Sequence, residues 1–149
     1  MDERIFNVNH VVFDENSTTQ EGAFSSIAEL ANELGYVTSE EAFYNDLKNR
    51  EKESTTGFKD GIAIPHGKSR NVKKSGVFVA KYNHPIDWNS LDGKPVEVAI
   101  ALTIPEEGAN DHLKILSKIA RKLLDKEFVS NLKNATSAED VAQVINEVE

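Results

Sequence analysis

The sequence predicts an α/β fold in which strands are flanked by helices. Two runs rich in apolar and β-branched residues lie in the middle of the chain, and amphipathic helical patterns occupy the first and last thirds. The length of 149 residues is in the range of one ordinary globular domain. No internal repeat or linker-like change in composition indicates a second domain, so residues 1–149 are expected to form a single domain with one core.

In the first third, a short strand is expected before two helices. Residues 10–13 are β-branched or aromatic and precede a polar turn cluster, which predicts the strand. Apolar residues recur every three to four positions over residues 19–34, and Gly35 supplies a stop, so this stretch is expected to be a helix. Ser39, followed by two glutamates, is expected to cap a second helix that ends at about Arg50.

The middle of the chain holds the strongest strand signals. The polar residues 54–61 are expected to form a loop that leads into a very short apolar segment at 62–64. The basic, small-residue stretch 68–75 then leads into a strand at 76–82, and a second strand is expected at 96–104. These two strands could pair antiparallel across a long connection.

The last third is expected to be helical. An apolar helix face runs from about residue 111 to residue 123, and a shorter helix contains Phe128 and Leu132. Ser137 is expected to open a closing helix with a buried apolar stripe.

The composition excludes several classes of function. A net charge of −8 opposes contacts with phosphate backbones, so nucleic acid is not expected as a partner. The absence of cysteine excludes disulfides, thiolate metal sites and a cysteine nucleophile. The longest strongly apolar stretch, residues 96–104, is far shorter than the roughly 20 residues that cross a bilayer, and the N-terminus lacks the pattern of a secretory signal. No direct insertion into a membrane is therefore expected, and the expected location is cytoplasmic.

Four histidines are candidates for the chemistry. His66 lies between a proline and a glycine, which would present its side chain at a strand end. His112 lies near the start of a predicted helix and could donate a hydrogen bond, whereas His84 in a turn region and His10 near the first strand are expected to be structural. No pair of histidines has the short spacing of a zinc site, and no phosphate-binding glycine loop is found, so neither a metal nor a nucleotide cofactor is expected.

The residues alone make His66 a candidate nucleophile, with Arg50 and Lys68 as nearby cations that could hold an anion. Structural alternatives stay open at this point. His66 could be a structural histidine, Arg50 an ordinary cation at a helix end, and Lys68 a solvated loop residue. A Ser-His-Asp hydrolase is not excluded, although the sequence has no Gly-x-Ser-x-Gly elbow.

Residues 61–67 (Gly-Ile-Ala-Ile-Pro-His-Gly) closely resemble the signature of the enzyme IIA domains of the bacterial sugar phosphotransferase system, mannitol/fructose type. The resemblance covers essentially the whole chain, because further parts of the family pattern recur in order and spacing. In chain order, these are Arg50 with the acidic Glu51, Glu53, the Ser-Thr-Gly-like residues 54–57, the fructose-branch residues 87–93, and His112 in its His-Leu-x-x-Leu context.

The resemblance implies a mixed β-sheet flanked by α-helices, and a phosphotransferase that uses a phosphohistidine. It implies that His66 accepts a phosphoryl group at Nε2 from the carrier protein HPr and passes it to a cysteine of enzyme IIB. Arg50 would bind the phosphoryl oxygens, and His112 would either do the same or tune the nucleophile. No cofactor is implied, and the membrane permease IIC would be reached only indirectly.

Two roles are compatible with this resemblance. The first is a transport component that feeds enzyme IIB for uptake of a sugar such as fructose or mannitol. The alternative is a regulatory enzyme IIA of the nitrogen-related branch, whose phosphorylation switches its binding to target proteins. In both, partners would dock on an apolar rim around His66, for which Phe58, Ile62 and Ile64 are candidates.

Overall fold

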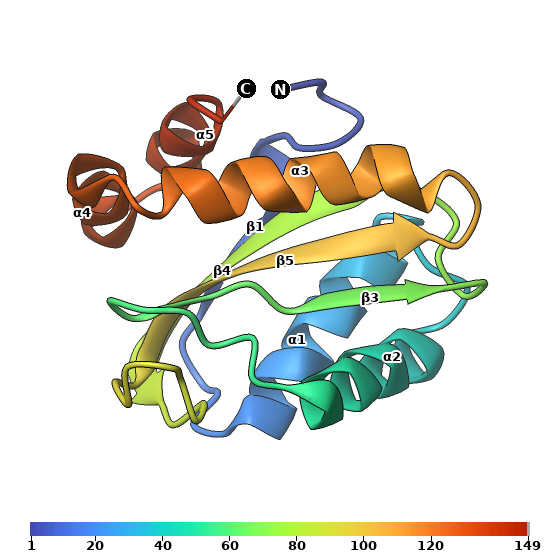
Figure 1. Ribbon diagram of the computed structural model, residues 1–149, viewed down its shortest axis with the longest axis horizontal. Coiled ribbons are helices and arrows are strands. Elements are labelled where there is room, and N and C mark those ends of the chain that lie inside the picture. The colour runs from blue at the N-terminus through green and yellow to red at the C-terminus, as the bar shows by residue number, and fades with distance from the viewer. Residues whose placement is uncertain (149) are drawn as a thin grey trace.

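The computed structural model describes residues 1–148, apart from the side chains of residues 109 and 111. A mixed β-sheet lies between two layers of helices (Figure 1). One layer covers one face of the sheet with α1 (Gln20–Glu33) and α2 (Glu40–Glu53), and the other covers the opposite face with α3 (Ala109–Lys122), α4 (Lys126–Asn134) and α5 (Ala138–Ile145). The predicted α/β fold is therefore confirmed.

Within residues 1–148, five strands form the sheet. They are β1 (Val11–Asp14), β2 (Ile62–Ala63), β3 (His66–Ser69), β4 (Gly76–Ile86) and β5 (Val96–Pro105). The order is β1-β4-β5-β2, and β3 also pairs with β5. The long strands β4 and β5 are antiparallel, as the sequence predicts, whereas β1, β2 and β3 each run parallel to their neighbour. A single 3₁₀ turn, η1 (Val8–His10), precedes β1.

The strands β2 and β3 are two parts of one interrupted edge strand. Ile62 lies opposite Val98 and His66 lies opposite Leu102, so the partner is 36 positions further along in both parts. Pro65 lies between them and has no N–H to add to the ladder, which interrupts the pairing without changing its register. The sequence analysis did not predict β3, because this edge strand is short and polar and shows no apolar alternation.

The sheet divides the core into two apolar clusters, one on each face, rather than the one core expected. On β5, Val98, Ile100 and Leu102 belong to the cluster beneath α3–α5, whereas Ala99 and Ala101 belong to the cluster beneath α1 and α2. Burial on both faces explains why the sequence shows a continuous apolar run here instead of an alternating one. Each large aliphatic side chain buried in this way contributes about 1.5–3 kcal/mol to stability.

The helix ends follow the signals in the sequence. The side chains of Thr19, Ser39 and Ser137 each accept a hydrogen bond from a backbone N–H in the first turn of α1, α2 and α5. Gly35, just past α1, has a φ of +84°, which a side-chain-bearing residue rarely adopts. The caps therefore fix where three of the helices begin.

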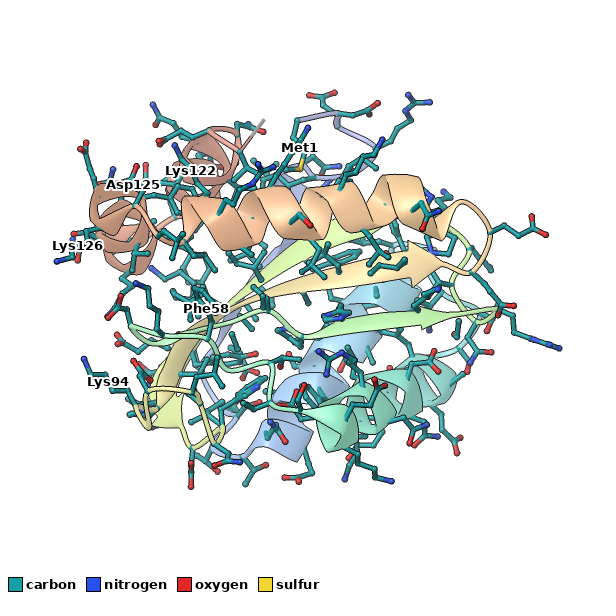
Figure 2. The ribbon with its side chains drawn as sticks, in the orientation of Figure 1. Met1, Phe58, Lys94, Lys122, Asp125 and Lys126 are labelled. Atoms are coloured by element: carbon teal, nitrogen blue, oxygen red, sulfur yellow. The ribbon has the colours of Figure 1, made fainter. Side chains whose placement is uncertain are left out.

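The connection between α3 and α4 is held by charge. Lys122 at the end of α3 lies 3.9 Å from Asp125, which also caps α4; Figure 2 labels both residues. Nearby, the ammonium of Lys81 on β4 donates hydrogen bonds to the carbonyls of Leu132, Lys133 and Ala135 at the end of α4.

Within the described part of the chain, no helix is both long and apolar enough to cross a bilayer.

Candidate active site

The close packing of α2 against β3 brings Arg50 to His66. A Cβ at Gly67 would lie 2.6 Å from Cε1 of Phe43 and 3.1 Å from Cβ of Asp46, both on α2. Only glycine therefore allows the helix to approach β3 this closely. The helix also continues to residue 53, about a turn past its predicted end near Arg50. This extension gives Arg50 a fixed helical backbone opposite His66.

The ring of His66 is held by two hydrogen bonds that define its tautomer. Arg50 donates its Nε–H to Nε2 of His66 at 3.2 Å, and Nδ1 of His66 lies 3.0 Å from the carbonyl oxygen of Ile64. A guanidinium can only donate and a carbonyl can only accept. Nδ1 must therefore carry the proton, and Nε2 must present its lone pair to Arg50.

Burial lowers the pKa of His66 below its ordinary value of 6.5. The positive charge of Arg50 acts in the same direction, whereas the hydrogen bond to Ile64 and the carboxylates of Glu51 and Glu53 act against it. The lowered pKa keeps the imidazole neutral near pH 7, the form in which a ring nitrogen can act as a nucleophile.

His66 opens onto a pocket of about 410 Å³ between α2, β3 and α3. The pocket is lined from α2 by Asp46, Asn49, Arg50 and Glu53, from β3 by His66 and Lys68, and by Ile104 and Leu113. The α2 residues are spaced i, i+3, i+4 and i+7, which places them on one helix face. The sequence analysis missed Asp46 and Asn49, although counting along the helix from Arg50 would have found both.

The structure brings Arg50 and Lys68 to the same pocket as His66, whereas His112 is not among the residues that line it. Nε2 of His112 would lie 3.5 Å from a Cβ added at Gly108, so this ring folds back toward the start of α3. The next residue, Leu113, lines the pocket. Among residues 1–148, no hydrogen bond joins His112 to His66, and a direct role for His112 stays a prediction.

The other two histidines lie outside this pocket. His10 is buried in the apolar core, in agreement with the structural role expected for it. His84 is exposed on β4 rather than in a turn, because β4 continues to Ile86. In the part of the chain that the structure describes, no three His, Asp or Glu side chains gather as a metal ion would require.

Of the three apolar residues considered for a docking rim, Ile62 is a core residue with 1% exposure. Phe58 and Ile64 are half-buried and pack against the cluster beneath α3–α5; Figure 2 labels Phe58. Neither residue lines the pocket, whose apolar lining comes from Ile104 and Leu113.

Comparisons with known proteins show the family of this chain. The family described as phosphoenolpyruvate-dependent sugar phosphotransferase system, EIIA 2, matches residues 4–148. The chain belongs to this family. Its members are phosphotransferase domains that carry a phosphohistidine intermediate, so this enzyme IIA is a phosphotransferase domain.

Two relatives of this enzyme IIA carry fructose in their names. The PTS system fructose-like EIIA component of Escherichia coli K12 is 37% identical over 124 residues, which cover 81% of this chain and 84% of the relative. The PTS system fructose-specific EIIA component of Haloferax volcanii is 36% identical over 138 residues, which cover 93% and 90% of the two chains.

Two solved structures share the fold. The nitrogen regulatory protein IIA-Ntr from Neisseria meningitidis superimposes with a TM-score of 0.87 at 30% identity, covering 96% of this chain and 97% of the other. The mannitol enzyme IIA in its complex with phosphorylated enzyme IIB from Escherichia coli gives a TM-score of 0.79 at 20% identity, covering 95% and 97%. At 20% identity, the second likeness establishes the fold alone.

Proposed function

We propose that this enzyme IIA domain is a phosphohistidine carrier that accepts a phosphoryl group from phosphorylated HPr on Nε2 of His66 and passes it to an enzyme IIB. The observation that carries the proposal is the pair of hydrogen bonds on the His66 ring. In each bond the direction is fixed, because the Arg50 guanidinium can only donate and the Ile64 carbonyl can only accept. They leave the proton on Nδ1 and the lone pair on Nε2, at the edge of a pocket large enough to admit a phosphoryl group.

In the first transfer, the Nε2 lone pair forms an N–P bond while the bond between phosphorus and the donor breaks. The proton stays on Nδ1 and remains hydrogen-bonded to the Ile64 carbonyl, which stabilises the ring as it becomes positively charged. In the second transfer, a thiolate of enzyme IIB attacks phosphorus, and the N–P electron pair returns to Nε2. The histidine is therefore regenerated in its starting tautomer.

Arg50 has to exchange its partner during this cycle. Its Nε–H hydrogen-bonds to Nε2 before the transfer, but once Nε2 is bonded to phosphorus, the guanidinium is free to donate to the phosphoryl oxygens. A planar guanidinium matches the oxygens of a transferring phosphoryl group with parallel donors. Lys68, which lines the same pocket from β3, adds a second positive charge. His112 would bind the phosphoryl oxygens or tune the nucleophile, as the family resemblance implies.

A role in sugar uptake is supported by the two fructose-named relatives. The fold shared with the mannitol enzyme IIA in its complex with phosphorylated enzyme IIB supports an enzyme IIB as the acceptor. HPr is the donor expected for this family.

The alternative is a regulatory, nitrogen-branch enzyme IIA that uses the same phosphohistidine to switch its binding to target proteins. The likeness to IIA-Ntr from Neisseria meningitidis, at 30% identity over nearly the whole chain, favours this second function. Mixing the phosphorylated protein with candidate enzyme IIB proteins separates the two roles. Rapid loss of label to an enzyme IIB cysteine supports transport, whereas a stable phosphoprotein supports regulation.

The proposal is tested by incubating the protein with HPr that carries radioactive phosphate. We expect label that is stable in alkali, labile in acid, and located by peptide mapping on the peptide that contains His66. Absence of label, or label on a peptide without His66, would contradict the proposed chemistry.

A further inference from the structure

Thr56, in the loop between α2 and β2, uses every one of its polar groups. Its N–H and hydroxyl donate to the two carboxylate oxygens of Glu51 at 2.8 and 2.6 Å, and its hydroxyl accepts from the indole N–H of Trp88 at 3.1 Å. Its carbonyl accepts from the N–H of Ile64 at 3.0 Å. Thr56 is only 4% exposed, so an unpaired group here would be costly.

The two hydrogen-bond partners of His66 are both fixed close to Thr56. Ile64 is bonded to Thr56 through its N–H, and its own carbonyl accepts the Nδ1–H of His66. Arg50, which donates to Nε2, donates its Nη1–H to the carbonyl of Ser54 at 2.9 Å, two residues before Thr56. The position and tautomer of the His66 ring therefore depend on the backbone of one loop.

The loop is held on its other side by residues 87–93. The hydroxyl of Thr55 donates to the carbonyl of Trp88 at 3.2 Å, and the N–H of Leu91 donates to the carbonyl of Gly57 at 3.1 Å. A Cβ at Gly57 would lie 2.3 Å from the Ser90 hydroxyl, so the backbone of the loop packs directly against Ser90. Thr56 is the point at which α2, this connection and the strand before His66 are joined.

We propose that Thr56 is a positioning residue for phosphoryl transfer at His66, acting through the Ser54 and Ile64 carbonyls that hold Arg50 and the His66 ring. Thr56 does not line the pocket and touches no reacting atom. The inference rests on the proposed function of His66 and adds to it a residue that sets the geometry of the nucleophile. Because a misplacement of about 1 Å can slow a reaction 10²-fold, a partial loosening of this loop is expected to slow transfer roughly tenfold.

Three variants test this role. Thr56→Val keeps the shape but removes the hydroxyl, which leaves the Trp88 indole N–H and one Glu51 oxygen unpaired, whereas Thr56→Ser restores the hydroxyl. Tyr36→Phe is the matched control, because it removes another well-formed hydroxyl bond, the 2.6 Å bond to the Arg4 carbonyl, away from the pocket. Transfer from phosphorylated HPr is timed, and ¹⁵N NMR of the His66 ring reports the population of the Nδ1–H tautomer and the pKa.

We expect Thr56→Val to slow transfer roughly tenfold, to raise the population of the Nε2–H tautomer and to move the pKa of His66 toward 6.5. Thr56→Ser and Tyr36→Phe should stay within about twofold of the parent, with an unchanged tautomer. Parental rate and tautomer in Thr56→Val would overturn the positioning role, and so would an equal loss in Tyr36→Phe. If Thr56→Val does not fold, Thr56→Ala replaces it, and the same changes in transfer rate and tautomer population are expected.

The NMR readout needs no phosphoryl donor, so it separates this inference from the proposed function. A parent protein that takes no label, with a tautomer that still depends on the Thr56 hydroxyl, contradicts the proposed function but not the link between Thr56 and His66. A parent that is labelled on His66, with a tautomer and rate indifferent to Thr56, contradicts only the positioning role.

Discussion

His10 and His66 are held in the same way and differ in what surrounds them. Nδ1 of His10 lies 2.9 Å from the carbonyl of Val77, and the amide of Asn7 donates to its Nε2 at 3.4 Å, so this ring also carries its proton on Nδ1. Burial lowers the pKa of His10, as it does for His66. Tautomer and pKa alone therefore do not distinguish a reactive histidine from a structural one.

The difference lies in access and in the group that faces Nε2. His10 is 1% exposed, with its ring stacked on Phe78 at 4.7 Å and in edge contact with Tyr36. Nε2 of His66 accepts a hydrogen bond from the Arg50 guanidinium beside an open pocket. In the proposed cycle, this guanidinium turns to the phosphoryl group once the nitrogen has reacted. A neutral imidazole becomes a candidate nucleophile where its unprotonated nitrogen borders an open pocket. The donor that hydrogen-bonds to this nitrogen must also be able to move to another acceptor.

Removing the His66 ring tests this difference most directly. His66→Ala is expected to abolish labelling by phosphorylated HPr, because His66 is the one histidine among the described residues that line this pocket. His84→Ala, which removes an exposed histidine, is the control and should label like the parent. Scintillation counting of the isolated protein measures the label on both variants. Label retained by His66→Ala would show that His66 is not the phosphorylated histidine.

Arg50→Ala is expected to slow phosphoryl transfer about 10²-fold while the protein still folds and is labelled on His66. The physical reason is the loss of a preorganised donor to the phosphoryl oxygens, which typically costs 10²–10³ in rate. Arg121→Ala, at the exposed end of α3, is the matched control. Rapid-quench experiments measure the phosphoryl-transfer rate of both variants. A rate within twofold of the parent for Arg50→Ala would show that Arg50 has no role in the mechanism.

His10→Ala is expected to lower the free energy of unfolding by about 3 kcal/mol, since it leaves a cavity among aromatic rings and an unpaired Val77 carbonyl. Urea unfolding measures this loss at a temperature where the variant remains folded. Its transfer rate at that temperature should stay close to that of the parent. A rate loss beyond tenfold in folded His10→Ala would mean that this histidine also serves the reaction.

Gly67→Ala tests the approach of α2 to β3. The added methyl would meet Phe43 at 2.6 Å, and such overpacking typically costs 1–3 kcal/mol. Because relief of this clash moves α2 away from β3, the transfer rate should fall along with the stability. Gly93→Ala is the contrasting control, since a Cβ there meets nothing within 4 Å and any cost arises from its φ of +76° alone. Equal transfer rates in these two variants would disprove the spacing role of Gly67.

Acid should destabilise the protein through both rings. The pKa of each is lowered in the folded state, so the unfolded chain binds protons first as the pH falls below 6.5. The stability that depends on the neutral rings is complete above pH 6.5 and is lost as the pH falls toward the folded-state pKa. His10→Phe removes the contribution of one ring, so its urea-unfolding free energy should change less than that of the parent between pH 7.5 and 5.5. An identical slope in the two proteins would contradict this linkage.

The helices and the long strands could be predicted from the sequence, because caps such as Ser39 and the apolar run at residues 96–104 are local signals. The sequence was not sufficient for β3, whose residues are polar and which is a strand only because β5 pairs with it. Pro85 suggested a turn at His84, yet β4 continues through it at the irregular pairing between Lys81 and Ile86, where proline is tolerated.

The site was predictable only in part, for the same reason. The sequence makes His66 and Arg50 candidate site residues, and the family resemblance of residues 61–67 and of Arg50-Glu51 predicts their roles. The 3.2 Å contact between them depends on how closely α2 packs on β3, which no local pattern encodes. The expectation that His10 is structural agreed with its burial, but its partner Val77 lies 67 positions away and could not be identified from the sequence.

The strand register also bears on the order of folding. Val79 of β4 pairs with Ile100, 21 residues away (100 − 79), and His66 pairs with Leu102, 36 residues away (102 − 66), whereas Val11 pairs with Val79, 68 residues away (79 − 11). Closing a longer loop costs more chain entropy, so the β4–β5 hairpin should form first and β1 should dock last. His66 would then meet β5 before the opposite edge of the sheet is complete, so the edge that carries His66 should form early in folding and the N-terminal edge late.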